Sequence, residues 1–188
     1  MPENQRVRLT KKMLKDSLIR LLFKESIHKL SVTQICEDAQ INRTTFYKYY
    51  GSQYELLEEM ESDVLAQLTT HLNLLDLDAE DASLDNTAQL VRTMSFINDN
   101  IDLCRLLLNN NVDPEFPEKL LLTLKNIPHL ISHQLSGKYT DEEYAYIFDF
   151  MISGGFSFIR KWINKENRET PEEIAVLLNN TLLKFLRV

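Results

Sequence analysis

The chain has 188 residues, of which 44% are hydrophobic and 26% charged, a composition typical of a globular protein that buries a core. Its four glycines and five prolines are too few for a glycine-rich phosphate-binding loop or for the turns of an all-β sandwich. Two cysteines exclude a disulfide framework and a four-cysteine zinc site. These counts predict an all-α protein.

The N-terminus lacks the apolar core of a signal peptide, and the longest uncharged apolar stretch, residues 150–159, is half of a membrane span of roughly 20 residues. We therefore expect a soluble cytoplasmic protein without a membrane partner. The net charge of −7 is uneven: residues 1–54 carry ten basic and five acidic residues, whereas residues 55–188 carry 11 basic and 23 acidic residues. This distribution favours contact between the N-terminal part alone and a polyanion.

Helix signals begin close to the N-terminus. Leucines three and four residues apart predict an amphipathic helix from Thr10 to Glu25. Two short helices follow at residues 32–39 and 43–49, with Ser31 and Asn42 as their expected N-caps. Ser52 is expected to begin a long fourth helix, whose apolar series reaches about residue 77.

Five further helices are expected after an acidic loop at residues 76–85. They cover about residues 85–97, 101–108, 114–135, 140–164 and 171–188, and Pro128 is expected to kink or split the third of them. Thr140 and Thr170 have the spacing of capping-box residues. The predicted all-α fold thus has about nine helices, with a three-helix domain at residues 1–51 joined to a helical bundle at residues 52–188.

The helices at residues 32–39 and 43–49, joined by a three-residue turn, have the outline of a helix-turn-helix motif. Ile35, Ala39, Ile41 and Phe46 have the spacing of its small inner core. The other side chains of the second helix can donate hydrogen bonds and none is acidic, which suits a DNA groove, although in isolation they would be read as an ordinary solvated face. The candidate DNA-binding residues are Ser31, Thr33, Arg43, Thr44, Thr45, Tyr47, Lys48 and Tyr49.

The region from Thr10 to Leu57 resembles the DNA-binding domain of the TetR (TetR/AcrR) family of transcriptional regulators. The residues that carry this resemblance are Leu22-Phe23, Ile35, Ala39, Thr45-Phe46-Tyr47, Tyr50 and Leu56-Leu57. The family usually has glycine in the turn where this chain has Gln40, and often lysine where it has Gln53. Residues 154–175 are similar, more loosely, to a regulatory domain of part of the family. The resemblance implies a homodimer that binds a double-stranded DNA operator and encloses a pocket for a small-molecule effector.

The last two predicted helices are apolar on more than one side, so other surfaces must cover them. Two copies of the chain could do so in a symmetric four-helix interface, in which Gly154 and Gly155 allow close approach; a monomer whose core they fill is the alternative. The candidate dimer-interface residues are Phe158, Trp162, Leu178, Leu182 and Leu183. The candidate effector-pocket residues, which could also be ordinary core, are Met60, Phe96, Cys104, Phe116, His133, Tyr144, Phe148 and Met151.

No set of side chains suited to catalysis appears, and His129 and His133, although one helical turn apart, lack a third metal ligand. We therefore expect no enzyme activity, no metal site and no cofactor. The sequence favours a homodimeric repressor that a small-molecule effector releases from its operator. The alternatives are a repressor or activator that a protein partner controls, and a helix-turn-helix adaptor or enzyme that does not bind DNA.

Overall fold

The computed structural model describes residues 5–75, 82–109, 112–127 and 139–186. These residues form nine α-helices and no strand, which confirms the predicted all-α class. The helices are α1 (Gln5–Leu22), α2 (Val32–Ala39), α3 (Arg43–Phe46), α4 (Gln53–Leu72), α5 (Ala82–Asp99), α6 (Ile101–Leu108), α7 (Phe116–Lys125), α8 (Asp141–Ile163) and α9 (Pro171–Leu186).

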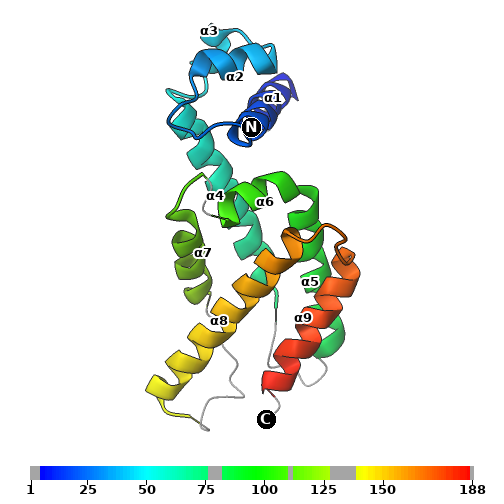
Figure 1. The fold of residues 1–188 in the computed structure, drawn as a ribbon. Coiled ribbons are helices and arrows are strands. Elements are labelled where there is room, and N and C mark those ends of the chain that lie inside the picture. The colour runs from blue at the N-terminus through cyan, green and yellow to red at the C-terminus, as the bar shows by residue number, and fades with distance from the viewer. Residues whose placement is uncertain (1–4, 76–81, 110–111, 128–138, 187–188) are drawn as a thin grey trace.

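Helices α1, α2 and α3 form a small unit at one end of the molecule, here called the head (residues 5–50; Figure 1). Its core consists of fully buried side chains, among them Leu14 and Leu18 of α1, Ile35 of α2 and Phe46 of α3. Ser17, also buried, donates a hydrogen bond to the Ile35 carbonyl oxygen at 3.0 Å and so joins α1 to α2. Each fully buried apolar side chain contributes about 1.5–3 kcal/mol, so packing stabilises helices that are too short to be stable alone.

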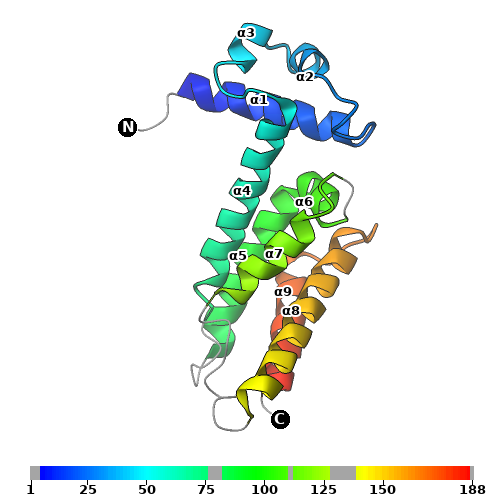
Figure 2. The same cartoon turned by 90° about the vertical axis from the view of Figure 1, so that its left-hand side faces the viewer.

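Helix α4 leaves the head and joins the remaining helices, here called the body (residues 53–186). Figure 2 shows α1 lying across the beginning of α4, while α5 and α7 lie beside the rest of it. Helix α5 packs along α9, where Asn179 donates a hydrogen bond to Thr87 Oγ1 at 2.7 Å. Helix α6 is joined to the end of α8, because Arg105 Nε donates to the Ile163 carbonyl oxygen at 2.7 Å. Helix α4 therefore connects the head to the bundle along the chain, and α1 of the head also packs against α6.

The predicted N-caps are confirmed. The Ser31 hydroxyl accepts a hydrogen bond from the Gln34 backbone N–H at 3.3 Å, and the Gln34 side chain accepts one from the Ser31 N–H at 2.8 Å. Asn42 Oδ1 accepts a hydrogen bond at 2.8 Å at the start of α3, and Ser52 and Thr140 cap α4 and α8 in the same manner. These contacts satisfy N–H groups that the first helical turn leaves unpaired, which is why the starts of these helices can be predicted locally.

Two helices of the head differ in length from the prediction. Helix α1 begins five residues before the expected Thr10, whose hydroxyl lies within the helix and donates to a carbonyl oxygen four residues earlier at 2.9 Å; the helix ends early, at Leu22. Helix α3 ends at Phe46. After it, the backbone N–H groups of Lys48 and Tyr49 donate to carbonyl oxygens three residues earlier, as in a 3₁₀ turn, and not four residues earlier as in an α-helix. Lys48 and Tyr49 therefore lie in a turn and not in the predicted helix.

Three boundaries in the body also differ from the prediction. Helix α4 ends at Leu72, five residues before the predicted end, and α5 begins at Ala82, inside the expected acidic loop. The predicted helix at residues 114–135 is wrong in length, since α7 ends at Lys125. Its end precedes Pro128, and a residue directly before proline disfavours the helical conformation. Pro128 and the predicted kink lie outside the described residues.

The turn between α2 and α3 contains a left-handed residue. Gln40 has φ 54° and ψ 37°, the region that glycine adopts most readily, and Ile41 N–H donates to the Cys36 carbonyl oxygen at 2.9 Å. Gln40 thus adopts the left-handed conformation at the turn position where the family that this region resembles usually has glycine.

We expect Gln40→Gly to raise the free energy of unfolding by up to about 1 kcal/mol, because it removes the Cβ clash of the left-handed conformation. Gln40→Ala keeps the Cβ atom and should leave the free energy of unfolding nearly unchanged. Urea denaturation followed by circular dichroism measures both variants. Equal stability of Gln40→Gly and Gln40→Ala would contradict the assigned strain.

Candidate DNA-binding surface and ligand cavity

The surface of α3 and the turn after it carries most of the predicted DNA-contacting side chains. Phe46 is completely buried, whereas Arg43, Thr44 and Lys48 are exposed and Tyr47 is 52% exposed. The Tyr47 ring packs edge-on against Phe46, with the ring centroids 5.6 Å apart, so a buried neighbour positions it. Exposed donors on an element without carboxylates match the acceptors of DNA phosphates and base edges.

The other predicted DNA-binding residues are less available. Thr33, Thr45 and Tyr49 are half-buried. Ser31 is exposed, but its hydroxyl donates to Gln34 Oε1 at 2.8 Å as part of the α2 cap. The hydroxyl and the backbone N–H of Ser31 therefore both serve the cap that begins α2.

Ion pairs join α1 of the head to α4. The Glu59 carboxylate lies 3.0 Å from Lys11 Nζ and 2.7 Å from Lys15 Nζ, and it accepts a hydrogen bond from the Tyr50 hydroxyl at 3.0 Å. Lys15 also contacts Asp63, at 2.6 Å. Burial alone raises the pKa of Glu59, but these three donors hold it below its usual value. The partners are far apart in sequence, so no local pattern predicted this connection.

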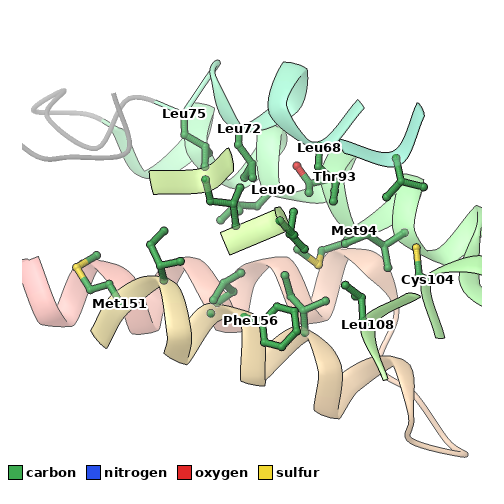
Figure 3. A pocket seen from close by; sticks show the side chains of 18 of the residues that line it. Leu68, Leu72, Leu75, Leu90, Thr93, Met94, Cys104, Leu108, Met151 and Phe156 are labelled. Atoms are coloured by element: carbon green, nitrogen blue, oxygen red, sulfur yellow. The ribbon is translucent and has the colours of Figure 1, made fainter. Parts of the chain in front are cut away.

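An apolar cavity of about 120 Å³ lies within the body, between α4 and α5 on one side and α8 and α9 on the other (Figure 3). Leu75 and Met151 lie towards one end of it and Cys104 and Leu108 towards the other. Among the described residues that line it, none is charged, and Thr93 is the one hydroxyl-bearing side chain. The cavity is therefore suited to nonpolar matter.

Half of the predicted pocket residues line this cavity: Cys104, Phe116, Phe148 and Met151. Met60 and Phe96 do not, and they border a more open groove beneath α1. His133 and the side chain of Tyr144 lie outside the described part of the structure. The prediction missed mainly leucines and isoleucines from α4 to α9, because nothing in the sequence separates a leucine that lines a cavity from one in a filled core.

A second acidic residue of α4, Glu61, is 7% exposed and meets charged groups of the segment that leads into α7 and of α7 itself. Lys119 Nζ lies 3.7 Å from Glu61 Oε2 and 2.8 Å from Asp113 Oδ2, and Glu61 shares a hydrogen bond with Asp113. Burial and the Asp113 charge raise the pKa of Glu61 to about 7, against the attraction of Lys119. Glu61 therefore binds a proton near neutral pH where α4 meets α7.

Apolar side chains are exposed on both α8 and α9; the exposed residues Tyr146, Phe150, Gly154, Val176 and Leu177 are here called the outer face. The four larger side chains are between 45% and 71% exposed. Tyr146, Phe150 and Gly154 are successively four residues apart, so they share one side of α8. A Cβ atom on Gly154 would meet no other atom within 4 Å, so this position leaves room for a second backbone.

The predicted dimer-interface residues lie mostly inside the chain itself. Trp162 is 2% exposed, and its indole N–H donates to a backbone carbonyl oxygen at 3.0 Å. Leu178 is buried and lines the cavity together with Leu182, while Phe158 is half-buried against the core. The side chain of Leu183 is not among those described. The apolar pattern of the sequence does not distinguish the sides of α8 and α9 that pack inside the chain from the sides that are exposed in it.

Within the described ranges, no three His, Cys, Asp or Glu side chains are grouped so that they could hold a metal ion. None of the described helices combines the length and the apolar character that crossing a bilayer requires. Cys36 and Cys104 are both buried free thiols.

The chain matches two models of protein families. Residues 85–184, more than half of the chain, match a model described as a transcriptional regulator C-terminal region. Residues 16–60, which include α2, α3 and the beginning of α4, match a model described as bacterial regulatory proteins of the tetR family. No curated protein sequence matches the chain.

Several solved structures have a similar fold over nearly the whole chain. The dihydroxyacetone kinase operon activator DhaS is 21% identical, with a TM-score of 0.64 and 95% of this chain and 96% of that chain covered. A TetR transcriptional regulator from Streptococcus agalactiae 2603V is 20% identical, with a TM-score of 0.63 and the same shares covered. The fatty acid degradation regulator FadR from Bacillus halodurans is 13% identical, with a TM-score of 0.62 and 97% of each chain covered.

At these identities the structural likeness shows the fold alone, whereas the two family models cover most of the head and most of the body. The exposed, acid-free surface of α3 lies in the region that matches the tetR model. The chain therefore belongs to the TetR family of transcriptional regulators, which are DNA-binding proteins and not enzymes.

Proposed function

We propose that the protein is a homodimeric repressor and that a small-molecule effector in the body cavity relieves its binding to a DNA operator. The observation that supports this proposal most strongly is the position of α4. Glu59 ties its first half to α1 of the head, and Leu68 and Leu72 of its second half line the cavity. A ligand that binds more tightly to one position of α4 would shift the population of head positions. If that position is unfavourable for DNA binding, operator affinity falls by the ratio of the ligand's affinities for the two positions.

The DNA contacts are assigned to the exposed side chains of α3 and the turn that follows. We assign Arg43 to a base edge, because a guanidinium can pair with guanine through two hydrogen bonds. Lys48 and Tyr47 are assigned to phosphates, which position a protein on DNA without reading its sequence. We place the boundary between the DNA-binding domain and the body between residues 51 and 52, where the Ser52 cap begins α4.

The outer face of α8 and α9 is assigned to the dimer. Exposed apolar side chains next to an open Gly154 favour packing against a second copy, in which the two α8–α9 pairs form a four-helix interface. A two-fold dimer requires a near-palindromic operator. Its two α3 helices should reach major grooves about 34–36 Å apart, or a multiple of that distance.

The experiment that tests this function is selection of bound duplexes from a random pool by the purified protein. The recovered sites show whether an operator exists, whether it is palindromic and how far apart its half-sites lie. Palindromic sites with half-site centres one or two helical turns apart would support the dimer. Recovery of no preferred sequence would contradict the proposal.

Substitutions at the head test the assigned contacts. We expect the logarithm of operator affinity to fall with the logarithm of salt concentration with a slope of roughly −0.9 per phosphate contacted, and Lys48→Ala to reduce the slope by about one. Arg43→Ala should cost about 1–3 kcal/mol and relax the preference at one base pair. Fluorescence anisotropy with labelled duplex measures both, and Lys161→Ala, at an exposed lysine of α8, is the control. Unchanged binding by both head variants would refute this interface.

Activation is the second candidate, because one of the similar structures is named an operon activator. A promoter that carries the selected operator, fused to a reporter gene, distinguishes the two signs of regulation. Expression that falls when the protein is supplied indicates repression, and expression that rises indicates activation.

A further inference from the structure

The described residues that line the cavity of the body offer almost no polar atoms to a ligand. Thr93 has the one hydroxyl group among them, and it already donates to the Gln89 carbonyl oxygen at 3.0 Å. Burial raises the pKa of the Cys104 thiol to about 12, so this side chain is neutral at physiological pH. A charged or strongly hydrogen-bonding group inside the cavity would lose its water without gaining partners, which opposes its entry.

The same lack of partners opposes filling by water. Water molecules inside proteins make about three hydrogen bonds to buried polar groups, and cavities lined by leucine, isoleucine and phenylalanine stay dry yet accept nonpolar guests. A nonpolar ligand would instead regain the dispersion contacts that the side chains around the cavity lack.

The shape of the cavity limits the size of such a ligand. The side chains of α8 that line it run from Phe148 to Ile159, a length of roughly 16 Å at the rise of an α-helix. Its volume of about 120 Å³ is somewhat smaller than an apolar cavity of about 150 Å³ that accepts benzene. A cavity that is long but small in volume is narrow, so it suits a short alkyl chain or a single flat ring.

Two adjacent glycines of α8 lie on different surfaces. Gly155 lines the cavity, whereas Gly154 is exposed on the outer face. A Cβ atom on either glycine would meet no other atom within 4 Å. Gly155 therefore leaves space inside the body that a side chain would otherwise occupy.

We propose that this cavity binds an uncharged hydrocarbon group, a short alkyl chain or a single aromatic ring, and that the absent side chain at Gly155 provides part of its room. This ligand class rests on the proposed function, which makes the cavity the effector site. Carboxylic acids and amines with as many carbon atoms as such a hydrocarbon are charged, and this charge excludes them from the cavity itself.

The test compares four probes on the full-length protein: n-hexane, benzene, hexanoate and hexylammonium. At a free concentration about ten times its Kd, a hydrocarbon is expected to raise the melting temperature by about 3–6 °C. Hexanoate and hexylammonium at equal concentration are expected to leave it unchanged. A larger shift with either ion than with the hydrocarbons, or no shift with any probe, would overturn the inference.

Variants at the two glycines locate the binding. Gly155→Leu is expected to fill the cavity and abolish the shift in melting temperature caused by hydrocarbons. Gly155→Ala, which replaces it if the larger variant does not fold, is expected to weaken that shift. Gly154→Ala is the matched control, because it also removes a helical glycine but changes the outer face, and it should keep the full shift. Hydrocarbon shifts that are equal in Gly155→Ala, Gly154→Ala and the unmodified protein would place the binding elsewhere and contradict the inference.

Operator affinity, measured with the same probes, separates this inference from the proposed function. A hydrocarbon that stabilises the protein and weakens operator binding at least fivefold supports both. Stabilisation without any change in operator affinity supports the ligand class and contradicts relief by an effector. If only hexanoate or hexylammonium stabilises the protein and weakens operator binding, the ligand class is overturned and the proposed function is retained.

Discussion

Phe150→Arg on α8 is expected to convert the proposed dimer into a monomer and to weaken operator binding at least a hundredfold. Phe150 is 62% exposed in the single chain, and a second copy would cover it in the proposed interface. A charge buried there without a partner costs several kcal/mol, and each 1.4 kcal/mol corresponds to about a tenfold change in affinity. Leu177→Arg on α9 should act in the same way. Light scattering measures the mass, and titration of labelled operator measures the affinity.

Leu122→Arg is the matched control for these two variants. Leu122 is 53% exposed, but it lies on α7, outside the outer face, so this variant should remain dimeric. The monomeric variants should keep their helical content and a weak, salt-sensitive affinity for any DNA, because the head is unchanged. An unmodified protein that is monomeric at micromolar concentration and binds a half-site as tightly as the whole operator would contradict the dimeric mechanism.

Glu61→Gln is expected to stabilise the protein at pH 8 by about 1–3 kcal/mol and to have little effect at pH 5. The pKa of Glu61 is raised from 4.5 to about 7 in the folded chain, so the folded state binds more protons than the unfolded state between these values. The stability that Glu61 contributes is fully present below pH 4.5 and is lost as the pH rises through 7. Glutamine resembles the protonated carboxyl group and does not titrate, so it removes this loss.

Urea denaturation of both proteins at pH 5, 6, 7 and 8 measures the difference in unfolding free energy at each pH. Glu172→Gln, at an exposed carboxylate of α9 that is not among the groups acting on Glu61, is the control, and its difference from the unmodified protein should vary little with pH. Lower stability of Glu61→Gln at pH 8 would mean that attraction to Lys119 outweighs burial and the Asp113 charge. In that case the ionised form would be the stable one, and the assigned proton would be absent.

The starts of several helices and the type of the head domain could be read from the sequence, because local contacts decide both. Ser31, Asn42, Ser52 and Thr140 cap their helices through hydrogen bonds to groups two or three residues away. The helix-turn-helix core also lies within a short stretch of chain, and Phe46 is completely buried as its spacing predicted. Helix ends were less predictable, since leaving a helix depends on weaker local preferences and on packing.

Only the tertiary structure decided which side chains face the interior and which are exposed. The sequence marked α8 and α9 as apolar on several sides, but packing in the body placed Trp162 and Leu178 inside and left Phe150 and Leu177 outside. The contact between Glu59 and Lys15 joins residues 44 positions apart, and no periodicity predicts such a pair. The burial of Glu61 likewise arises where α4 meets α7, and the cavity and the room at Gly155 arise where α4, α5, α8 and α9 meet. Such features depend on distances between elements, which the order of residues along one helix does not contain.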